Sequence, residues 1–263
     1  MEKRNRIYNY QKAEIALLKE TSKIESIGDD YFFISKQFPS YIGGNGVIVN
    51  TSGFISLGSI IEQFKALYPS ISSYTIYYFD KENHDKMVYD ALLAQCTVDF
   101  IKIMYAPVHK LQQAVSSAES SMSVRVIKDE IDWELYKRHQ SDFHTDSWFA
   151  EEGYVKTRFV ADHLDMQWYA LFNKNNSQIL SSASILKVDN IARIEDLQTL
   201  PQEQRKGYAT SVLEAIRRLL VKEKTIEAVY LGVEADNYKA LRLYGKIGFE
   251  ALPHELMQIT IKP

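Results

Sequence analysis

Two stretches of this 263-residue chain, 154 residues apart, show the same order of predicted elements. In each stretch, a β-rich run precedes a helical pattern and a final strand, so that Tyr74–Ala106 aligns without gaps with Ala228–Thr260. The alignment also places Asn83 on Asn237, a match that chance could produce, whereas the shared element order is harder to attribute to chance. Self-similarity at a fixed separation is typical of a repeated supersecondary unit. The sequence therefore predicts two halves that contain the same unit.

The second half carries the clearest helical pattern. Between Glu203 and Lys224 the apolar residues recur with the spacing of one helix face, which predicts a long amphipathic helix. Gly248 follows a second helical pattern and is a typical C-cap residue. The other elements expected in this half are strands at 123–128, 166–173, 179–188, 191–200, 226–233 and 256–261, and helices at 131–138, 148–161 and 238–247.

The first half has weaker patterns. The segment Asp30–Tyr41 is dense in aromatic residues and is expected to contribute mainly to a core, although it could also line a pocket. A polar stretch, Pro107–Met122, has no strong apolar period and is interpreted as a linker between two domains. The elements expected before it are helices at 10–18, 60–67 and 85–96, and strands at 47–50, 74–79 and 98–105.

Composition excludes several classes of protein. The 31 basic and 34 acidic side chains give a net charge of −3, which is too balanced for binding nucleic acid through a broad basic field. A single cysteine, Cys96, can form neither an internal disulfide nor a thiolate-rich zinc site. No apolar run approaches the ~20 residues of a membrane helix. We therefore expect a cytoplasmic protein with no nucleic-acid or membrane partner.

The segment from Asp196 to Ala209 is the best candidate for a site that performs chemistry. A strand ends near Pro201, a short polar turn follows, and the long helix begins. The first N–H groups of a helix have no internal acceptor and carry a partial positive charge, and small residues let an anion approach them. Gly207 is small, and the basic Arg205 and Lys206 lie beside it. The turn is therefore predicted to bind a diphosphate or a similar anion, unless it is only a helix start after a proline turn.

Two motifs decide between these readings. Gln204-x-x-Gly207-x-Ala209 resembles the Q/R-x-x-G-x-G/A signature of the GNAT superfamily of N-acetyltransferases, and the segment from Asn237 to Glu250 resembles its N-x-x-A-x-x-L-Y-x-K-x-G-F motif. Arg205 stands where many members have glycine, at a position that the signature leaves free. The resemblance covers roughly residues 123–263. It implies an α/β fold of the α+β type, with a mixed, mostly antiparallel sheet split at the cofactor and flanked by helices.

The resemblance also implies a binding site for acetyl-CoA as co-substrate. The backbone N–H groups of the turn would hold the pyrophosphate, and Asn237 would bond to the cofactor arm. Backbone groups of Leu197 and Thr199 would pair with the pantetheine like an added strand. The full set of cofactor-binding residues is Leu197, Gln198, Thr199, Gln204, Arg205, Lys206, Gly207, Tyr208, Ala209, Thr210 and Asn237.

Catalytic roles follow from the same resemblance. Tyr244 would protonate the leaving thiolate, unless it is only a core tyrosine, because a phenol is a reasonable acid for a thiolate of comparable basicity. Strand alternation places Arg193, Glu195, Leu197 and Thr199 on one face, with Ile194, Asp196 and Gln198 on the other. Glu195 is therefore the first choice of base and Asp196 the second. Alternatively, Glu195 only orients the amine or pairs with Arg193.

The acceptor is expected to be a primary amine of a small molecule or peptide. Asp142, Asp146 and Trp148 lie in a loop that could bind a cationic amine, or that could simply be a solvated loop. The three histidines near this loop match no known metal-ligand spacing, so no metal is predicted. Cys96 is expected to be a buried small residue rather than a nucleophile.

The domain prediction follows. Residues 1–120 would form a degenerate GNAT-like domain without its own signature, and residues 121–263 the catalytic N-acetyltransferase domain. One acetyl-CoA site per chain is expected. The N-terminal domain would shape the acceptor pocket or make a homodimer contact. The alternative from another class is a non-catalytic acyl-CoA-binding sensor or interaction module, and a bulkier acyl-CoA donor also remains open.

Overall fold

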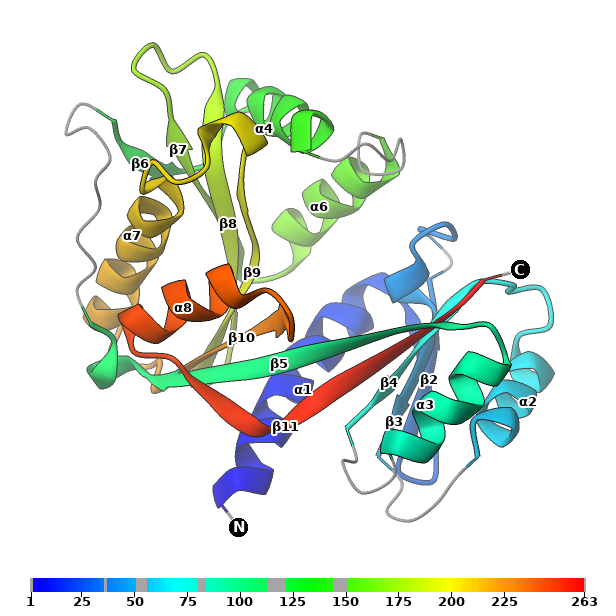
Figure 1. The fold of residues 1–263 in the computed structure, drawn as a ribbon. Coiled ribbons are helices and arrows are strands. Elements are labelled where there is room, and N and C mark those ends of the chain that lie inside the picture. Colours follow the sequence, from blue (N-terminus) through cyan, green and yellow to red (C-terminus); the bar gives the residue numbers. More distant parts are fainter. Residues whose placement is uncertain are drawn as a thin grey trace. The chain divides into compact units, whose positions relative to one another are not determined.

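The strand–helix–strand order predicted for both halves is present in the computed structural model of the chain (Figure 1). The structure describes residues 2–35, 37–50, 56–79, 84–112, 122–143 and 151–262. In the first half the repeated unit consists of β4 (Tyr74–Tyr78), α3 (His84–Leu93) and β5 (Thr97–Pro107). In the second half it consists of β10 (Ala228–Glu234), α8 (Tyr238–Ile247) and β11 (Glu250–Ile261). The predicted repeat of element order is confirmed.

The chain divides into two units built from interleaved segments. Unit 1 comprises Met1–Glu14, Met104–Leu231 and Tyr238–Glu250, and unit 2 comprises Ile15–Ile103, Gly232–Asn237 and Ala251–Pro263. These units do not coincide with a cut after residue 120, because β11 comes from the end of the chain yet pairs with β4 in unit 2. Of the expected linker, residues 113–121 lie outside the described residues, and Gln112 N–H donates to the Ile247 carbonyl within unit 1. The division into a catalytic and a degenerate domain stays a prediction.

Unit 1 contains a mixed sheet in which the ladders β6–β7, β7–β8 and β8–β9 are antiparallel and β9–β10 is parallel. This arrangement agrees with the predicted fold class. Its further elements are α1 (Glu2–Thr21, of which residues up to Glu14 belong to the unit), η2 (Val108–Lys110), β6 (Val124–Val126), α4 (Glu130–Phe143), α6 (Glu152–His163), β7 (Met166–Phe172), β8 (Ile179–Val188), β9 (Ile191–Thr199), η3 (Pro201–Glu203) and α7 (Tyr208–Lys222).

Helices cover both faces of the unit 1 sheet. On one face, Trp133 of α4 packs edge-on against Trp168 of β7, with ring centroids 5.7 Å apart. On the other face, Leu213 and Ile216 of α7 are buried and pack around Ile194 of β9. The apolar stripe predicted for the long helix is therefore its core-facing side.

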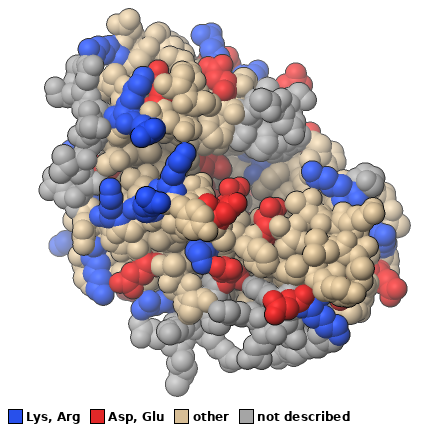
Figure 2. Space-filling model, in the orientation of Figure 1, with Lys and Arg blue, Asp and Glu red and all other residues tan. Residues whose placement is uncertain are grey.

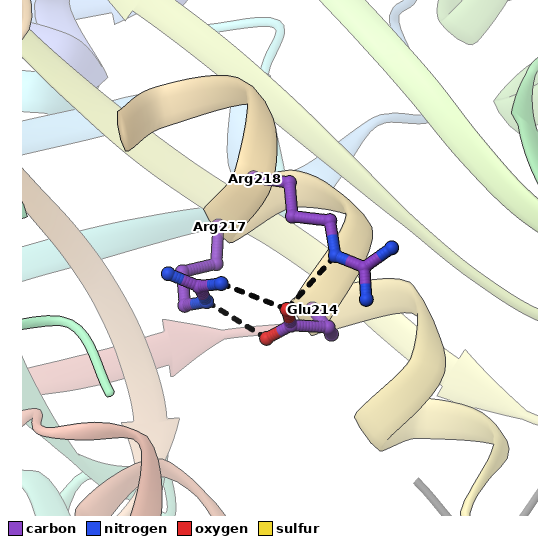
Figure 3. A network of polar contacts seen from close by, with 3 residues as sticks. All are labelled: Glu214, Arg217 and Arg218. Atoms are coloured by element: carbon purple, nitrogen blue, oxygen red, sulfur yellow. Dashed lines mark hydrogen bonds and ion pairs between the residues drawn. The ribbon is translucent and has the colours of Figure 1, made fainter. Parts of the chain in front are cut away.

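A polar network stabilises α7 on the side that the stripe leaves free (Figure 3). Glu214 is buried and accepts two hydrogen bonds from Arg217, at 2.7 and 2.8 Å, and a third from Arg218 at 3.0 Å. Residues three and four apart are neighbours on a helix, so these contacts follow from the spacing. Burial of a carboxylate is tolerated here because the bidentate guanidinium compensates its charge.

Unit 2 has its own mixed sheet and core. The ladders β1–β2, β2–β3 and β4–β11 are antiparallel, and β3–β4 is parallel. Phe64 of α2 stacks on Tyr74 of β4 at 4.0 Å, inside a cluster that also buries Phe32. The expected core role of the aromatic segment is thus confirmed for Phe32, and Phe33 and Phe38 are buried too. The remaining elements are β1 (Lys23–Ile27), β2 (Asp30–Ile34), η1 (Ile42–Gly44), β3 (Gly46–Val49) and α2 (Leu57–Leu67).

None of the helices built from the described residues combines the length and the apolar character that a bilayer-spanning helix needs.

Candidate functional site

A β-bulge interrupts β9 at the residues predicted to carry the chemistry. The β8–β9 ladder pairs Ser184 with Glu195 and Ser182 with Gln198, so two residues of β9 face one residue of β8. Asp196 adopts a left-handed φ of 51°, which few residues other than glycine, Asn and Asp adopt readily. The strand is therefore bent at Asp196 rather than continuously pleated.

The bulge corrects the predicted faces of this strand. Directly paired residues of antiparallel strands share a face, so Arg193, Glu195 and Gln198 lie on the face of Ser182 and Ser184. Thr199 pairs with Ser181 and lies on the opposite face. The prediction that Thr199 shares a face with Glu195, and Gln198 does not, was wrong. The extra residue reverses the alternation after Glu195.

The parallel ladder between β9 and β10 ends before either strand does. It pairs Ala228–Leu231 with Ile191–Ile194, whereas β9 continues to Thr199 and β10 to Glu234. Residues 195–199 thus run past the end of this ladder. Backbone groups that leave a ladder can pair with an extended ligand, which is the geometry that strand addition requires.

The turn after β9 has the backbone of an anion site. Arg205 has φ 66° and Gly207 has φ 82°, both in the left-handed region, and α7 begins only at Tyr208. The prediction that the helix begins at Glu203 was wrong, because η3 and this turn precede it. Gly207 is the N-cap and supplies no side-chain cap to the first N–H groups of α7. Left-handed residues at a helix start bring successive N–H groups to one side, where an anion can bind.

The side chains of the turn are placed as a surface site requires. Gln204, Arg205 and Lys206 are exposed, Ala209 and Thr210 are half-buried, and Tyr208 is buried. Lys206 pairs with Glu203 at 2.8 Å, and the Gln204 amide donates to the Thr199 carbonyl at 3.5 Å.

A second group of basic residues lies on α8 of the same unit. Figure 2 shows Lys and Arg side chains gathered over this helix. Lys239, Arg242 and Lys246 are exposed and follow one another at helical spacings of three and four residues, so they share one face. This exposed face of α8 is therefore positively charged, which suits a phosphate-bearing ligand.

Glu195 lies in a buried ion pair. Arg193 Nε contacts Glu195 Oε1, and Arg193 Nη1 donates to Glu14 Oε2 of α1 at 2.5 Å. The Glu195 side chain is 21% exposed and that of Arg193 is 8% exposed. Burial raises the pKa of Glu195 to about 7, with Glu14 and Asp196 acting in the same direction and Arg193 and Lys156 opposing them. A carboxylate with this pKa can exchange a proton near neutral pH.

Tyr244 lies on α8 in the same unit and is 7% exposed. Burial and, to a smaller degree, the Glu195 charge together raise the pKa of its phenol to about 12. The phenol is therefore protonated at neutral pH and can donate a proton. Asp196, the second choice of base, is exposed at the bulge. The structure thus brings Glu195, Asp196 and Tyr244 into one neighbourhood.

Of the three residues predicted to bind the acceptor, the structure describes one. Asp142 lies in the last turn of α4 and is exposed, whereas Asp146 and Trp148 lie outside the described residues. On the Glu195 face, the buried Gln140 of α4 donates to Gln198 at 3.1 Å. Asn237 is exposed and belongs to the segment Gly232–Asn237 of unit 2.

The remaining candidates have ordinary contacts. His139 bonds to the Ile179 carbonyl at 3.1 Å, and His163 stacks on Phe159. Within the part of the chain that the structure describes, no group of three or more His, Cys, Asp or Glu is placed to hold a metal ion. Cys96 packs at the margin of the unit 2 core, and burial raises the pKa of its thiol, which lowers its reactivity.

Sequence reasoning missed one member of the Glu195 network. Glu14 lies 179 residues before Arg193, and no local motif marks it. The only available signal was its place in a helical pattern beside buried positions such as Tyr10 and Ala13.

Comparison with known proteins identifies the domain that contains this site. The model of the Acetyltransferase (GNAT) family matches residues 131–249, which include the bulge, the left-handed turn and Tyr244. Residues 131–249 are a GNAT acetyltransferase domain. An N-alpha-acetyltransferase of Saccharolobus solfataricus is 35% identical to this chain over 57 residues, which cover 22% of this chain and 34% of that protein. The chain thus matches about a third of the length of this curated relative.

Solved structures resemble the chain over nearly its whole length. A GCN5-related N-acetyltransferase from Kribbella flavida superposes with a TM-score of 0.69 and 10% identity, covering 97% of this chain and 95% of that one. A tandem GNAT protein from the clavulanic acid biosynthesis pathway superposes with a TM-score of 0.59 and 11% identity, covering 91% and 83%. At this identity the likeness shows the fold alone. It extends to the N-terminal part, outside the GNAT match.

The residues of the GNAT domain fit the co-substrate that this family uses, acetyl-CoA. The uncapped, left-handed start of α7 suits a pyrophosphate, the end of the β9–β10 ladder suits an extended arm, and Tyr244 and Glu195 supply a proton donor and acceptor. By its family, the domain is of the N-acetyltransferase type.

Proposed function

We propose that this chain is an acetyl-CoA-dependent N-acetyltransferase that transfers an acetyl group directly to a primary amine of a small molecule or peptide. One observation carries the proposal. A half-buried carboxylate on β9 with a pKa near 7 and a protonated phenol on α8 occur in the same GNAT domain as the left-handed turn that begins α7. A binding module would not need either group.

Each residue then has a definite role. Bound acetyl-CoA supplies the activated acetyl group. The N–H groups at the start of α7 hold its pyrophosphate, and β9 beyond Ile194 holds its arm as an added strand. Glu195 accepts the proton that an ammonium must lose before the amine can attack. Tyr244 donates a proton to the departing sulfur. Positioning of both reactants supplies a further part of the acceleration.

The charge of the site favours a cationic acceptor. When Glu195 itself is counted, the three acidic groups Glu14, Glu195 and Asp196 outnumber the two basic groups, Arg193 and Lys156. A protonated amine is attracted to such a site and finds the base that deprotonates it. The exposed Asp142 of α4, and the predicted Asp146 and Trp148, would extend this preference.

Two assays test the proposal. Titration of acetyl-CoA by calorimetry measures cofactor binding, and a thiol-release assay with a panel of amines measures transfer. The proposal predicts binding and amine-dependent thiol release. Tight binding with no transfer to any amine would instead support a sensor module, and binding of bulkier acyl-CoA alone would change the donor.

A further inference from the structure

The N-terminal helix contributes a charged residue to the Glu195 network. Glu14 of α1 and Glu195 of β9 both contact the guanidinium of Arg193, so two carboxylates share one cation. The side chains of Glu14 and Arg193 are only 12% and 8% exposed. Glu14 lies outside residues 131–249, yet it belongs to the same unit as the site. The GNAT domain alone therefore lacks one member of this network.

The geometry fixes Arg193 from two sides. The ring of Tyr10, one helical turn before Glu14, lies 4.5 Å from the guanidinium carbon. Such a cation–π contact and a charge-assisted hydrogen bond at 2.5 Å together hold the guanidinium in one orientation. Burial opposes the charge of Arg193, but the two carboxylates raise the pKa of Arg193 well above its ordinary value. It is therefore a permanent cation.

The remaining charged and titratable groups that the structure describes near Glu195 lie on β9 and on four helices. Asp196 on the same strand disfavours its charge, whereas Lys156 of α6 favours it. Tyr10 and Tyr244 are neutral phenols, because burial raises the pKa of each. Tyr136 of α4, near Asp196, is neutral for the same reason. Glu14 is thus the acidic residue outside β9 that acts on Glu195 through the shared Arg193.

We propose that Glu14 is a positioning residue of the acetyl-transfer site, which shares the charge of Arg193 with Glu195 and so keeps Glu195 able to take up a proton. If Arg193 served Glu195 alone, the carboxylate would be fully compensated and a poor base. In the step concerned, an N–H bond of the acceptor ammonium breaks, and its proton forms an O–H bond with a Glu195 carboxylate oxygen. This inference rests on the proposed function for its meaning, but the electrostatic coupling can be measured without catalysis.

The test is the titration of Glu195 in the protein without acetyl-CoA. Carbon-13 NMR of glutamate-labelled protein reports each carboxyl, and Glu195→Gln identifies the signal. We expect a midpoint near pH 7 in the unaltered protein. In Glu14→Gln the midpoint should fall by about one pH unit or more, because Arg193 then compensates Glu195 alone. Glu14→Asp, which keeps the charge, should shift it much less.

A matched control removes the same charge elsewhere on the same helix. Glu20 is exposed on α1, so Glu20→Gln should leave the midpoint unchanged. If Glu14→Gln is too unstable to study, Glu14→Met fills the same space without a charge and should give the same downward shift. A midpoint in Glu14→Gln or Glu14→Met that equals that of Glu20→Gln would overturn the proposal.

Activity provides the second readout. The acidic limb of the pH profile of kcat/KM should move down by the same amount in Glu14→Gln. If the NMR midpoint shifts but the unaltered protein acetylates no amine, the coupling stands and the proposed function fails. If the protein is active but neither the midpoint nor the limb moves, the role of Glu14 is wrong and the proposed function stands.

Discussion

The two halves of the chain share a repeated unit but differ at the positions that are proposed to act in catalysis. The parallel ladders β9–β10 and β3–β4 show which residues of the two halves occupy equivalent positions. Val229 pairs with Ala192, and the equivalent Thr75 pairs with Gly46. Counting on from Ala192 and Gly46, the positions of Arg193 and Glu195 correspond to those of Val47 and Val49. Both valines are buried, at 0% and 2% exposure.

The helices that follow these strands, α2 after β3 and α7 after β9, also differ in how they begin. Ser56 caps α2, since its hydroxyl accepts the Ser59 N–H at 3.2 Å. Gly207 begins α7 in a left-handed conformation and has no capping side chain. Tyr244 of α8 corresponds, at the offset of 154, to Asp90 of α3. The first half therefore has a capped helix start and an apolar strand, whereas the second half has charged residues on β9 and no capping side chain at the start of α7.

The largest effect on activity is expected from a change at Glu195, the β9 residue whose counterpart in the first half is a buried valine. Glu195→Gln should lower kcat/KM about 1000-fold, because general-base catalysis contributes on the order of 10²–10⁴. In the unaltered protein, activity should fall as pH falls through about 7, since only the deprotonated carboxylate is a base. The variant should lose this acidic limb. Glu62→Gln, at an exposed position of α2, is the control. Equal activity of the two variants would remove Glu195 as base.

Tyr244→Phe should lower kcat about 100-fold with little change in acetyl-CoA affinity, because it removes only the proton donor. Steady-state kinetics with saturating acetyl-CoA measure this. Tyr238→Phe, an exposed tyrosine on the same helix, should behave like the unaltered protein. Full activity of Tyr244→Phe at all pH values would show that this tyrosine is only a core residue.

Gly207→Glu should weaken acetyl-CoA binding at least about tenfold. A side chain at φ 82° costs about 1–2 kcal/mol, and its carboxylate repels phosphate. Calorimetry measures the loss. Gly58→Glu makes the same change in the first turn of α2, where the added Cβ meets nothing closer than 4.0 Å. That variant should bind acetyl-CoA normally, and comparable losses in both variants would contradict the assignment.

Ser56→Ala should have the smallest effect. Loss of this cap should lower the free energy of unfolding by about 1 kcal/mol without changing acetyl-CoA affinity. Chemical denaturation gives the first quantity and calorimetry the second. A change in affinity, rather than stability, would mean that the start of α2 takes part in binding.

Much of the architecture was predictable from the sequence because it depends on local pattern. The apolar stripe of α7, the meander β7–β8 and the repeated unit all appear where periodicity placed them. The strand β1 was missed, since its residues, Lys23–Ile27, are largely polar and half-exposed. The pairing of β11 with β4 brings together residues about 180 positions apart, which local pattern cannot reveal.

The site was predictable in its residue types but not in its geometry. The GNAT motifs marked Gly207 and Tyr244. The bulge at Asp196 reversed the face of Thr199, because one inserted residue changes the parity of a strand without leaving a clear trace in composition. Glu14 joins Arg193 only through tertiary packing. Long-range charge pairs of this kind depend on the fold, and not on spacing.

The central claim is that only the second half of the chain holds acetyl-CoA. The number of acetyl-CoA molecules bound per chain, measured by calorimetric titration, tests it most directly. The account predicts that one acetyl-CoA binds per chain. Gly207→Glu should weaken this binding, and Gly58→Glu should leave it unchanged. Two equivalents bound per chain, or one equivalent that only Gly58→Glu weakens, would contradict it.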